Sequence, residues 1–337
     1  MSIGQYFGKM WSLLGTITNP SYFTYRLFHY LNKDVPYKIA KRIYLKNLKE
    51  YKAFQFNEFL LETFDGSGQA VHPDIAYFEN QYWLTVTPYP YGMEEYENPC
   101  IYQGDDLKNL RCPQGPIAVQ HKHIQGVHLS DPCFAVKDNN IFCYFRESER
   151  KENTEENTIW SLQLSRSERK WSKPELLLDS VDDKILSPAM IHNDAGELVI
   201  YFVSTLNNKY TLVSTKSSGV INDLTEYVIE GMPEGYDLWH IGIKKIRDIY
   251  KTNNDSNGLV GLFLMKSTYE IGRMKLFEAS NNGVETIWHI TKEVEMPIEI
   301  REVIKFPYKS CYIPQGDGSI LLSFRDKKSR NRLCIIK

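Results

Sequence analysis

Three observations predict an all-β fold, a five-bladed β-propeller over residues 53–337 preceded by a short α-helical arm over residues 1–52. From about residue 54 the chain consists of short β-runs separated by turn residues. One unit recurs five times: a turn residue with Pro or His, a hydrophobic strand, a polar turn and a strongly hydrophobic strand. Tyr, Phe and Trp make up 13% of the 337 residues, an enrichment that suits strands.

The N-terminal arm is basic and aromatic. Residues 1–52 hold nine Lys and Arg against two acidic side chains, a net charge of +7, whereas the whole chain carries −2. Residues 3–15 and 21–32 predict short amphipathic helices, broken at Asn19-Pro20. Two interpretations stay open: the arm covers an apolar face of the propeller, or it lies on an anionic membrane. A nucleic-acid partner is not expected, because the rest of the chain is acidic and no recognised motif is present.

The five copies of the unit are phased along the chain. Three of them carry an aligned proline, at Pro73, Pro132 and Pro188, the fourth begins near Leu238 and the fifth at Lys309. Further strand-like runs between the copies bring each repeat to about four strands, which is typical of a propeller blade. Because only about three strands follow the last start, residues 53–63 are expected to supply the strand that closes the ring. The alternative is a β-sandwich of similar short strands.

Neither a metal site nor a cofactor is predicted. The six cysteines form no CxxC pair, and His121, His123 and His128 lack a strong metal-ligand spacing, so a loop is expected there. No apolar run is long enough to span a membrane, and the first residues do not resemble a signal peptide. These features predict a cytoplasmic protein with reduced thiols.

The starts of the repeats predict the functional pocket, because the innermost strand of each propeller blade lines the central channel. Those positions hold His72 with Asp74, then Asp131, Ser187, Trp239 with His240, and Tyr312. Two aspartates facing each other across a funnel would suit acid–base catalysis by carboxylates.

The motifs HPDI (72–75) and SDPCF (130–134), the segment 87–101 and the five phased units resemble the five-bladed β-propeller carbohydrate-active enzymes. That superfamily includes arabinanases, β-xylosidases, invertases, levansucrases and mannoside phosphorylases, and the resemblance covers residues 54–337. It implies that Asp74 is the base or nucleophile and that Asp131 orients the site and tunes its pKa values. The third blade departs from the pattern, since Ser187 stands where the glycosidases carry a Glu general acid.

Three interpretations follow from the missing acid. Another carboxylate replaces it, with Glu97, Glu147 and Asp237 as candidates, and Glu147 is placed with Asp74 and Asp131 in the predicted catalytic set. Alternatively, the leaving group is a phosphate or nucleotide that needs no strong acid, as in a phosphorylase or glycosyltransferase. Thirdly, the pocket binds glycan without turnover.

The hypothesis is therefore a carbohydrate-active enzyme that acts on a glycan or glycosyl donor. Its location would be the cytoplasmic side of a membrane during surface-polysaccharide assembly. The predicted substrate-binding residues are His72, Tyr89, Tyr91, Glu97, Asn98, Arg146, Ser187, Asp237, Trp239, His240 and Arg325. For His240 the alternative to a role in ligand binding is a packed histidine bonded to the backbone. For Arg146 and Glu147 the alternative is that they pair with each other.

Overall fold

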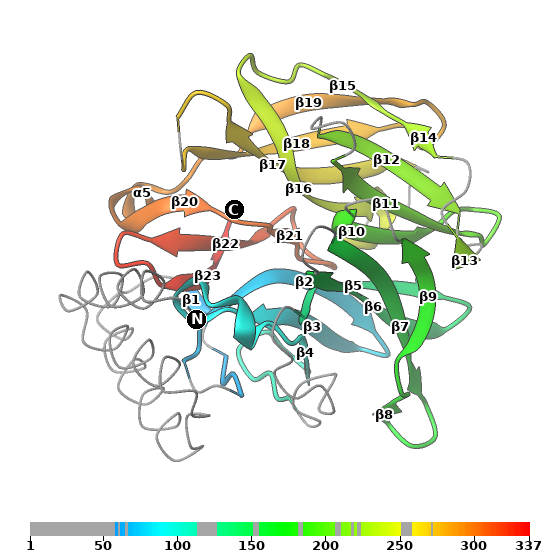
Figure 1. Ribbon diagram of the computed structural model, residues 1–337. Helices are drawn as coiled ribbons and strands as arrows, with labels where there is room; N and C mark the ends of the chain where they lie inside the picture. Colours follow the sequence, from blue (N-terminus) through cyan, green and yellow to red (C-terminus); the bar gives the residue numbers. More distant parts are fainter. Residues whose placement is uncertain are drawn as a thin grey trace, which may run out of the picture.

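The computed structural model is a five-bladed β-propeller, which confirms the predicted fold and excludes the sandwich (Figure 1). It describes residues 58–59, 61–64, 67–112, 127–150, 155–180, 185–205, 210–216, 219–220, 224–250, 258–270 and 272–337. The predicted helical arm of residues 1–52 and the histidines His121 and His123 lie outside the described residues.

Each blade is a sheet whose strands follow one another outwards from the channel. The first contains β2 (Ala70–Phe78), β3 (Gln81–Pro88) and β4 (Cys100–Gly104). The second contains β5 (Val127–Lys137), β6 (Asn140–Arg150), β7 (Glu155–Ser165), β8 (Lys170–Trp171), β9 (Glu175–Ser180) and the added β13 (Gly219–Val220). The third contains β10 (Ile185–His192), β11 (Leu198–Ser204), β12 (Thr211–Lys216) and β14 (Thr225–Glu226).

The last two blades complete the ring. The fourth contains β16 (Tyr236–Lys245), β17 (Leu259–Ser267), β18 (Met274–Asn281), β19 (Ile287–Glu293) and β15 (Val228–Glu230). The fifth contains β20 (Ile304–Pro307), β21 (Cys311–Tyr312), β22 (Ile320–Asp326), β23 (Asn331–Ile336) and β1 (Glu58–Phe59). Two short helices, α4 (Ile246–Ile249) and α5 (Ile298–Val303), lie between strands of these blades. Among the described residues, no helix has the length and apolarity that a membrane crossing requires.

The first and last strands of the described chain close the ring. β1 pairs antiparallel with β23, with Glu58 opposite Cys334 and Phe59 opposite Leu333. This pairing confirms that part of the segment 53–63 completes the fifth blade. Closure in this way leaves the last strand paired and removes an exposed edge.

A bulge at the start of the inner strands sets which side chains reach the channel. His72, Asp131 and Ser187 have φ angles of 53°, 53° and 49°, and each precedes a proline. The ladder shifts there: from Val71 to Asp74 the chain advances three residues while the facing strand β3 advances two. The same shift recurs between β5 and β6 and between β10 and β11. One extra residue is thus inserted per strand, and its side chain is displaced from the regular alternation.

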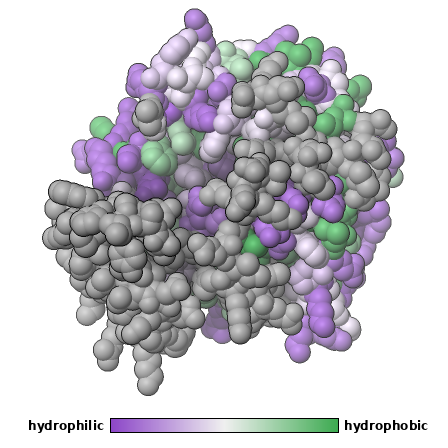
Figure 2. Space-filling view, viewed as in Figure 1, coloured by the Kyte–Doolittle hydropathy of each residue, from purple (hydrophilic) through white to green (hydrophobic). Residues whose placement is uncertain are grey.

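The core lies between neighbouring blades and is apolar and aromatic. Between the third and fourth blades, for example, Tyr201, Phe263 and Trp288 pack together. The six cysteines are free thiols, five of them buried, as the sequence predicts. In the face shown in Figure 2, most of the described surface is hydrophilic and the apolar side chains form scattered groups.

Candidate functional site

A pocket of about 390 Å³ opens at one mouth of the central channel, and all five blades contribute to its wall. It brings together seven of the residues that the sequence predicts for the site: His72, Tyr89, Glu97, Asp131, Arg146, Trp239 and His240. Its other lining residues are Glu94, His128, Ser148, Glu155, Leu186, Thr205, Tyr210 and Tyr308.

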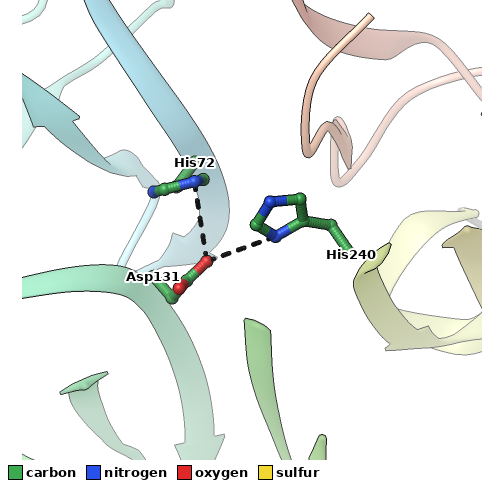
Figure 3. Close-up of side chains that lie close together, drawn as sticks. All are labelled: His72, Asp131 and His240. Carbon is green, nitrogen blue, oxygen red and sulfur yellow. Dashed lines mark ion pairs between the residues drawn. The ribbon is translucent and has the colours of Figure 1, made fainter. Parts of the chain in front are cut away.

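Asp131 forms the floor of this pocket. Its Oδ1 lies 3.7 Å from Nε2 of His72 and 3.7 Å from Nδ1 of His240, which project from β2 and β16 (Figure 3). Nζ of Lys309 is 3.5 Å from the same oxygen. On the other side, Nη2 of Arg146 is 3.3 Å from Oδ2. Three inner strands and the start of the fifth blade therefore converge on one carboxylate.

The charges at the floor follow from burial. Desolvation lowers the pKa of His72 to about 4 and the pKa of His240 well below its ordinary value, so both imidazoles are neutral at pH 7. Burial alone would raise the pKa of Asp131, but the positive charges of Lys309 and Arg146 outweigh it and hold that pKa well below its usual range. The floor thus contains a fixed carboxylate, two cations and two neutral imidazoles.

Arg146 is held rigidly on β6. Its Nη1 donates to the backbone oxygen of Ile185 at 2.9 Å, and its Nη2 donates to Oγ of Ser130 at 3.0 Å. Arg146 lies opposite Ser130 in the ladder, which directs it towards the channel. Glu147 is the next residue on the strand, so its side chain leaves from the opposite face, and it does not line the pocket.

Aromatic rings form one wall above the floor. The ring of Tyr308 lies 5.5 Å from His72, 5.4 Å from His240 and 6.4 Å from Tyr89, measured between centroids. Trp239 lies 5.8 Å from His240 and 5.6 Å from Tyr210. Aromatic faces of this kind suit the apolar C–H faces of sugar rings.

Tyr308 and Lys309 are site residues that the sequence reasoning missed. That reasoning took Tyr312 as the fifth inner position, but Tyr312 lines a different cavity of about 650 Å³ at the other mouth of the channel. The inner strand β21 has only two residues, so the segment just before it reaches the centre instead. The available signal was the position of Lys309 at the start of the fifth repeat.

Carboxylates form the remaining rim of the pocket. Of the three candidates for a substitute acid, Glu97 lines the pocket, whereas Glu147 and Asp237 do not. Asp237 lies on β16 just before the bulge, where it pairs with Lys266 on β17. Glu94 and Glu155, which the sequence reasoning did not select, also line it; Glu155 accepts a hydrogen bond from Oγ of Ser148 at 2.7 Å.

Asp74 does not face this pocket, which differs from the prediction. Its Oδ2 accepts hydrogen bonds from the backbone N–H of Phe134 and from Nζ of Lys244, each at 2.7 Å. The bulge at His72 and Pro73 explains the difference, because the extra residue moves Asp74 to the other phase of the strand. The first-blade position at the pocket is therefore filled by His72.

Four other predicted residues are placed outside the pocket lining. Oγ of Ser187 is buried between the inner strands of the third and fourth blades, β10 and β16, where it accepts from the N–H of Ile241 at 3.0 Å and donates to its carbonyl at 3.1 Å. Tyr91 is buried, and Nη2 of Arg325 donates to its carbonyl oxygen at 2.9 Å. Asn98 is absent from the lining as well.

Comparison with solved structures places this architecture among known proteins. An endo-arabinanase of glycoside hydrolase family 43 from Bacillus licheniformis superposes with a TM-score of 0.54 at 11% identity, covering 80% of this chain and 93% of that one. The fold is that of the family-43 glycoside hydrolases. An α-L-arabinofuranosidase from Lactobacillus brevis gives 0.54 at 10% identity over 79% and 90% of the two chains. A Bacillus subtilis arabinanase gives 0.52 at 12% identity over 80% and 94%.

The likeness extends to the fold and no further. No protein-family model and no curated protein sequence matches this chain. The resemblance inferred from HPDI, SDPCF and the five units is thus confirmed for the architecture, and the chemistry must be argued from the pocket itself.

Proposed function

We propose that the protein is a carbohydrate-active enzyme that acts on a glycan or glycosyl donor in the pocket above Asp131. The observation that carries the proposal is the combination of a fixed carboxylate floor with the aromatic wall of Tyr89, Trp239 and Tyr308 in one pocket. Neighbours of the same fold are described as arabinanases, arabinofuranosidases and xylosidases, which supports a carbohydrate substrate.

Asp131 would act as an ionised carboxylate throughout. Because its pKa is held low by the cations Lys309 and Arg146, it cannot donate a proton near neutral pH. It would instead orient the groups at the pocket floor, because the two cations beside it already balance its negative charge. Arg146 and Ser130 keep it in place through Oδ2.

Glu97 is the residue that we assign as proton donor to the leaving oxygen. It lines the pocket together with Tyr89 and Tyr308 of the aromatic wall. A general acid in this position would restore the function that Ser187 cannot perform.

A phosphorylase or glycosyltransferase is the second candidate. Two cations, Arg146 and Lys309, surround the single floor carboxylate, so this buried group has an excess of positive charge that favours an anionic leaving group. A phosphate or nucleotide leaves without strong acid assistance, which would also agree with Ser187 at the third position.

A mass-spectrometric turnover screen separates these functions. Oligosaccharides with and without phosphate, and sugar nucleotides with acceptors, are incubated with wild type, Glu97→Gln and the matched control Glu226→Gln, an exposed residue of the third blade. Hydrolysis that falls at least about 100-fold in Glu97→Gln and not in the control supports the proposal. Turnover that requires phosphate or an activated donor, and survives in Glu97→Gln, selects the second candidate. Glycan binding without turnover by any donor would contradict both.

We also propose that residues 1–52 attach the protein to an anionic membrane, at the cytoplasmic face. The support is the +7 charge of that segment and its interleaved aromatic residues. Sedimentation with vesicles that contain phosphatidylserine should recover the full chain but not residues 53–337, and high salt should release it. Equal recovery with neutral phosphatidylcholine vesicles would contradict this assignment.

A further inference from the structure

Three buried atoms at the pocket floor point towards one another without hydrogen-bond partners. Nε2 of His72, Nδ1 of His240 and Oδ1 of Asp131 are all buried, and none has a hydrogen-bond partner among the described residues, although the ammonium of Lys309 lies 3.5 Å from Oδ1. Figure 3 shows both imidazole rings turned towards the carboxylate. Unpaired buried polar atoms are costly, so three on one spot indicate that another species satisfies them.

The spacing of these atoms fits the ligands of a single metal ion. Two of the pairs, each nitrogen with Oδ1, are 3.7 Å apart, and all three atoms lie within 4.8 Å of one another. Ligands of a tetrahedral ion with bonds of about 2.1 Å lie about 3.4 Å apart. A small inward movement of two side chains would therefore complete the coordination.

The side-chain chemistry suits the same role. Imidazole nitrogens and a carboxylate oxygen are among the ligands that Zn²⁺ takes in proteins. Oδ2 of Asp131 is engaged by Arg146 and Ser130, which leaves Oδ1 as the oxygen that faces the histidines. Such outer contacts orient the ligands of metal sites.

We propose that His72, Asp131 and His240 bind one divalent first-row transition-metal ion, for which Zn²⁺ is the probe. Imidazole nitrogen suits Zn²⁺ and its neighbours, whereas Ca²⁺ and Mg²⁺ are held by oxygen ligands. Three protein ligands leave a coordination position open, and because all three residues line the pocket, that position faces the bound molecule. The inference stands on this geometry and does not require the substrate to be a carbohydrate.

Lys309 gives the proposal a distinctive consequence. Its ammonium lies 3.5 Å from Oδ1 of Asp131, and its Nζ also donates to the carbonyl of Pro188 at 3.2 Å. A metal ion would share the carboxylate with this cation and be repelled by it. Lys309→Met should therefore bind the ion more tightly than wild type, by about 10-fold or more.

The test measures metal on the full-length, tag-free chain after treatment with a chelator. Equilibrium dialysis against micromolar Zn²⁺, followed by elemental mass spectrometry, should give one ion per chain. His72→Asn, Asp131→Asn and His240→Asn should each weaken binding by at least about 100-fold, because loss of an outer contact alone costs 10–100-fold. Asn is chosen since it tolerates the positive φ of His72 and Asp131.

The matched control is His192→Asn. His192 also has ring nitrogens without a hydrogen-bond partner among the described residues, but it lines the other mouth of the channel. Its replacement should leave the metal content unchanged. Absence of Zn²⁺ from wild type at micromolar concentrations, or equal loss in the control, would overturn the proposal.

A measurement on wild type alone protects the test against variants that fail to fold. The X-ray absorption spectrum of the Zn²⁺-loaded chain should contain the scattering pattern of two imidazole ligands. A spectrum with oxygen neighbours only would overturn the assignment. Because no sugar is present in these experiments, their failure would leave the proposed carbohydrate function standing, and the turnover screen could fail without affecting them.

Discussion

At the scale of the residue, one inserted amino acid decides which side chains reach the pocket. Strict alternation along the first inner strand would place His72 and Asp74 on one face, and the sequence analysis selected the aspartate for its chemistry. His72 adopts a left-handed φ before Pro73, so the alternation is interrupted and Asp74 is turned to Lys244. A sequence pattern cannot predict this bulge, because the bulge depends on a positive φ at His72. Several residue types adopt a positive φ, so a histidine at this position does not indicate one.

Asp74 should therefore stabilise the fold rather than act in the pocket. Asp74→Asn leaves the partly buried Lys244, whose side chain is 15% exposed, without its counter-ion and should lower the free energy of unfolding by about 2–3 kcal/mol. The double variant Asp74→Leu with Lys244→Met should recover most of that loss, because neither charge is then buried alone. Urea denaturation measures both. An Asp74→Asn protein as stable as wild type but devoid of turnover would instead return Asp74 to the catalytic role.

At the scale of the element, the inner strands are joined by side chains as well as by packing. Ser187 stands at the bulge of β10 and exchanges two hydrogen bonds with the backbone of Ile241 on β16. The repeat made this position predictable as an inner one, whereas its partner on another blade depends on the tertiary arrangement. The position that resembles a general-acid site is thus occupied by a residue that connects two blades.

Loss of that connection should be measurable in stability alone. Ser187→Ala removes the acceptor and donor of two buried backbone groups and should cost about 2 kcal/mol. Ser161→Ala, whose Oγ donates to Glu175 near the surface, is the matched control and should change stability by less than about 0.5 kcal/mol. Equal effects of the two variants in urea denaturation would contradict the blade-connecting role.

At the scale of the whole molecule, the phased repeat predicted the number of blades and the strand that closes them. This succeeded because the repeat spacing and the missing last strand are properties of the chain as a whole, visible without side-chain detail. The convergence of His72, Asp131 and His240 could not be predicted in the same way. Their separations in sequence carry no metal-ligand spacing, and only ring closure brings β2, β5 and β16 to one axis.

Ring closure by β1 predicts where the chain can be shortened. A protein that begins at residue 53 should fold, whereas one that begins at residue 64 lacks Glu58 and Phe59 and leaves β23 as an exposed edge. The shorter chain should aggregate or lose its cooperative thermal transition in circular dichroism. Identical melting curves for the two chains would show that β1 does not close the ring.

The central claim is that the pocket above Asp131 binds carbohydrate against its aromatic wall. Saturation-transfer NMR with the same panel of oligosaccharides, sugar phosphates and sugar nucleotides tests it most directly. At least one compound should bind to wild type, and Trp239→Ala should weaken that binding by about 5-fold, since ring stacking contributes on the order of 1 kcal/mol. Tyr269→Ala, which removes an exposed aromatic ring that does not line the pocket, should leave binding unchanged. Binding of no member of the panel, or binding that is indifferent to Trp239, would contradict the account.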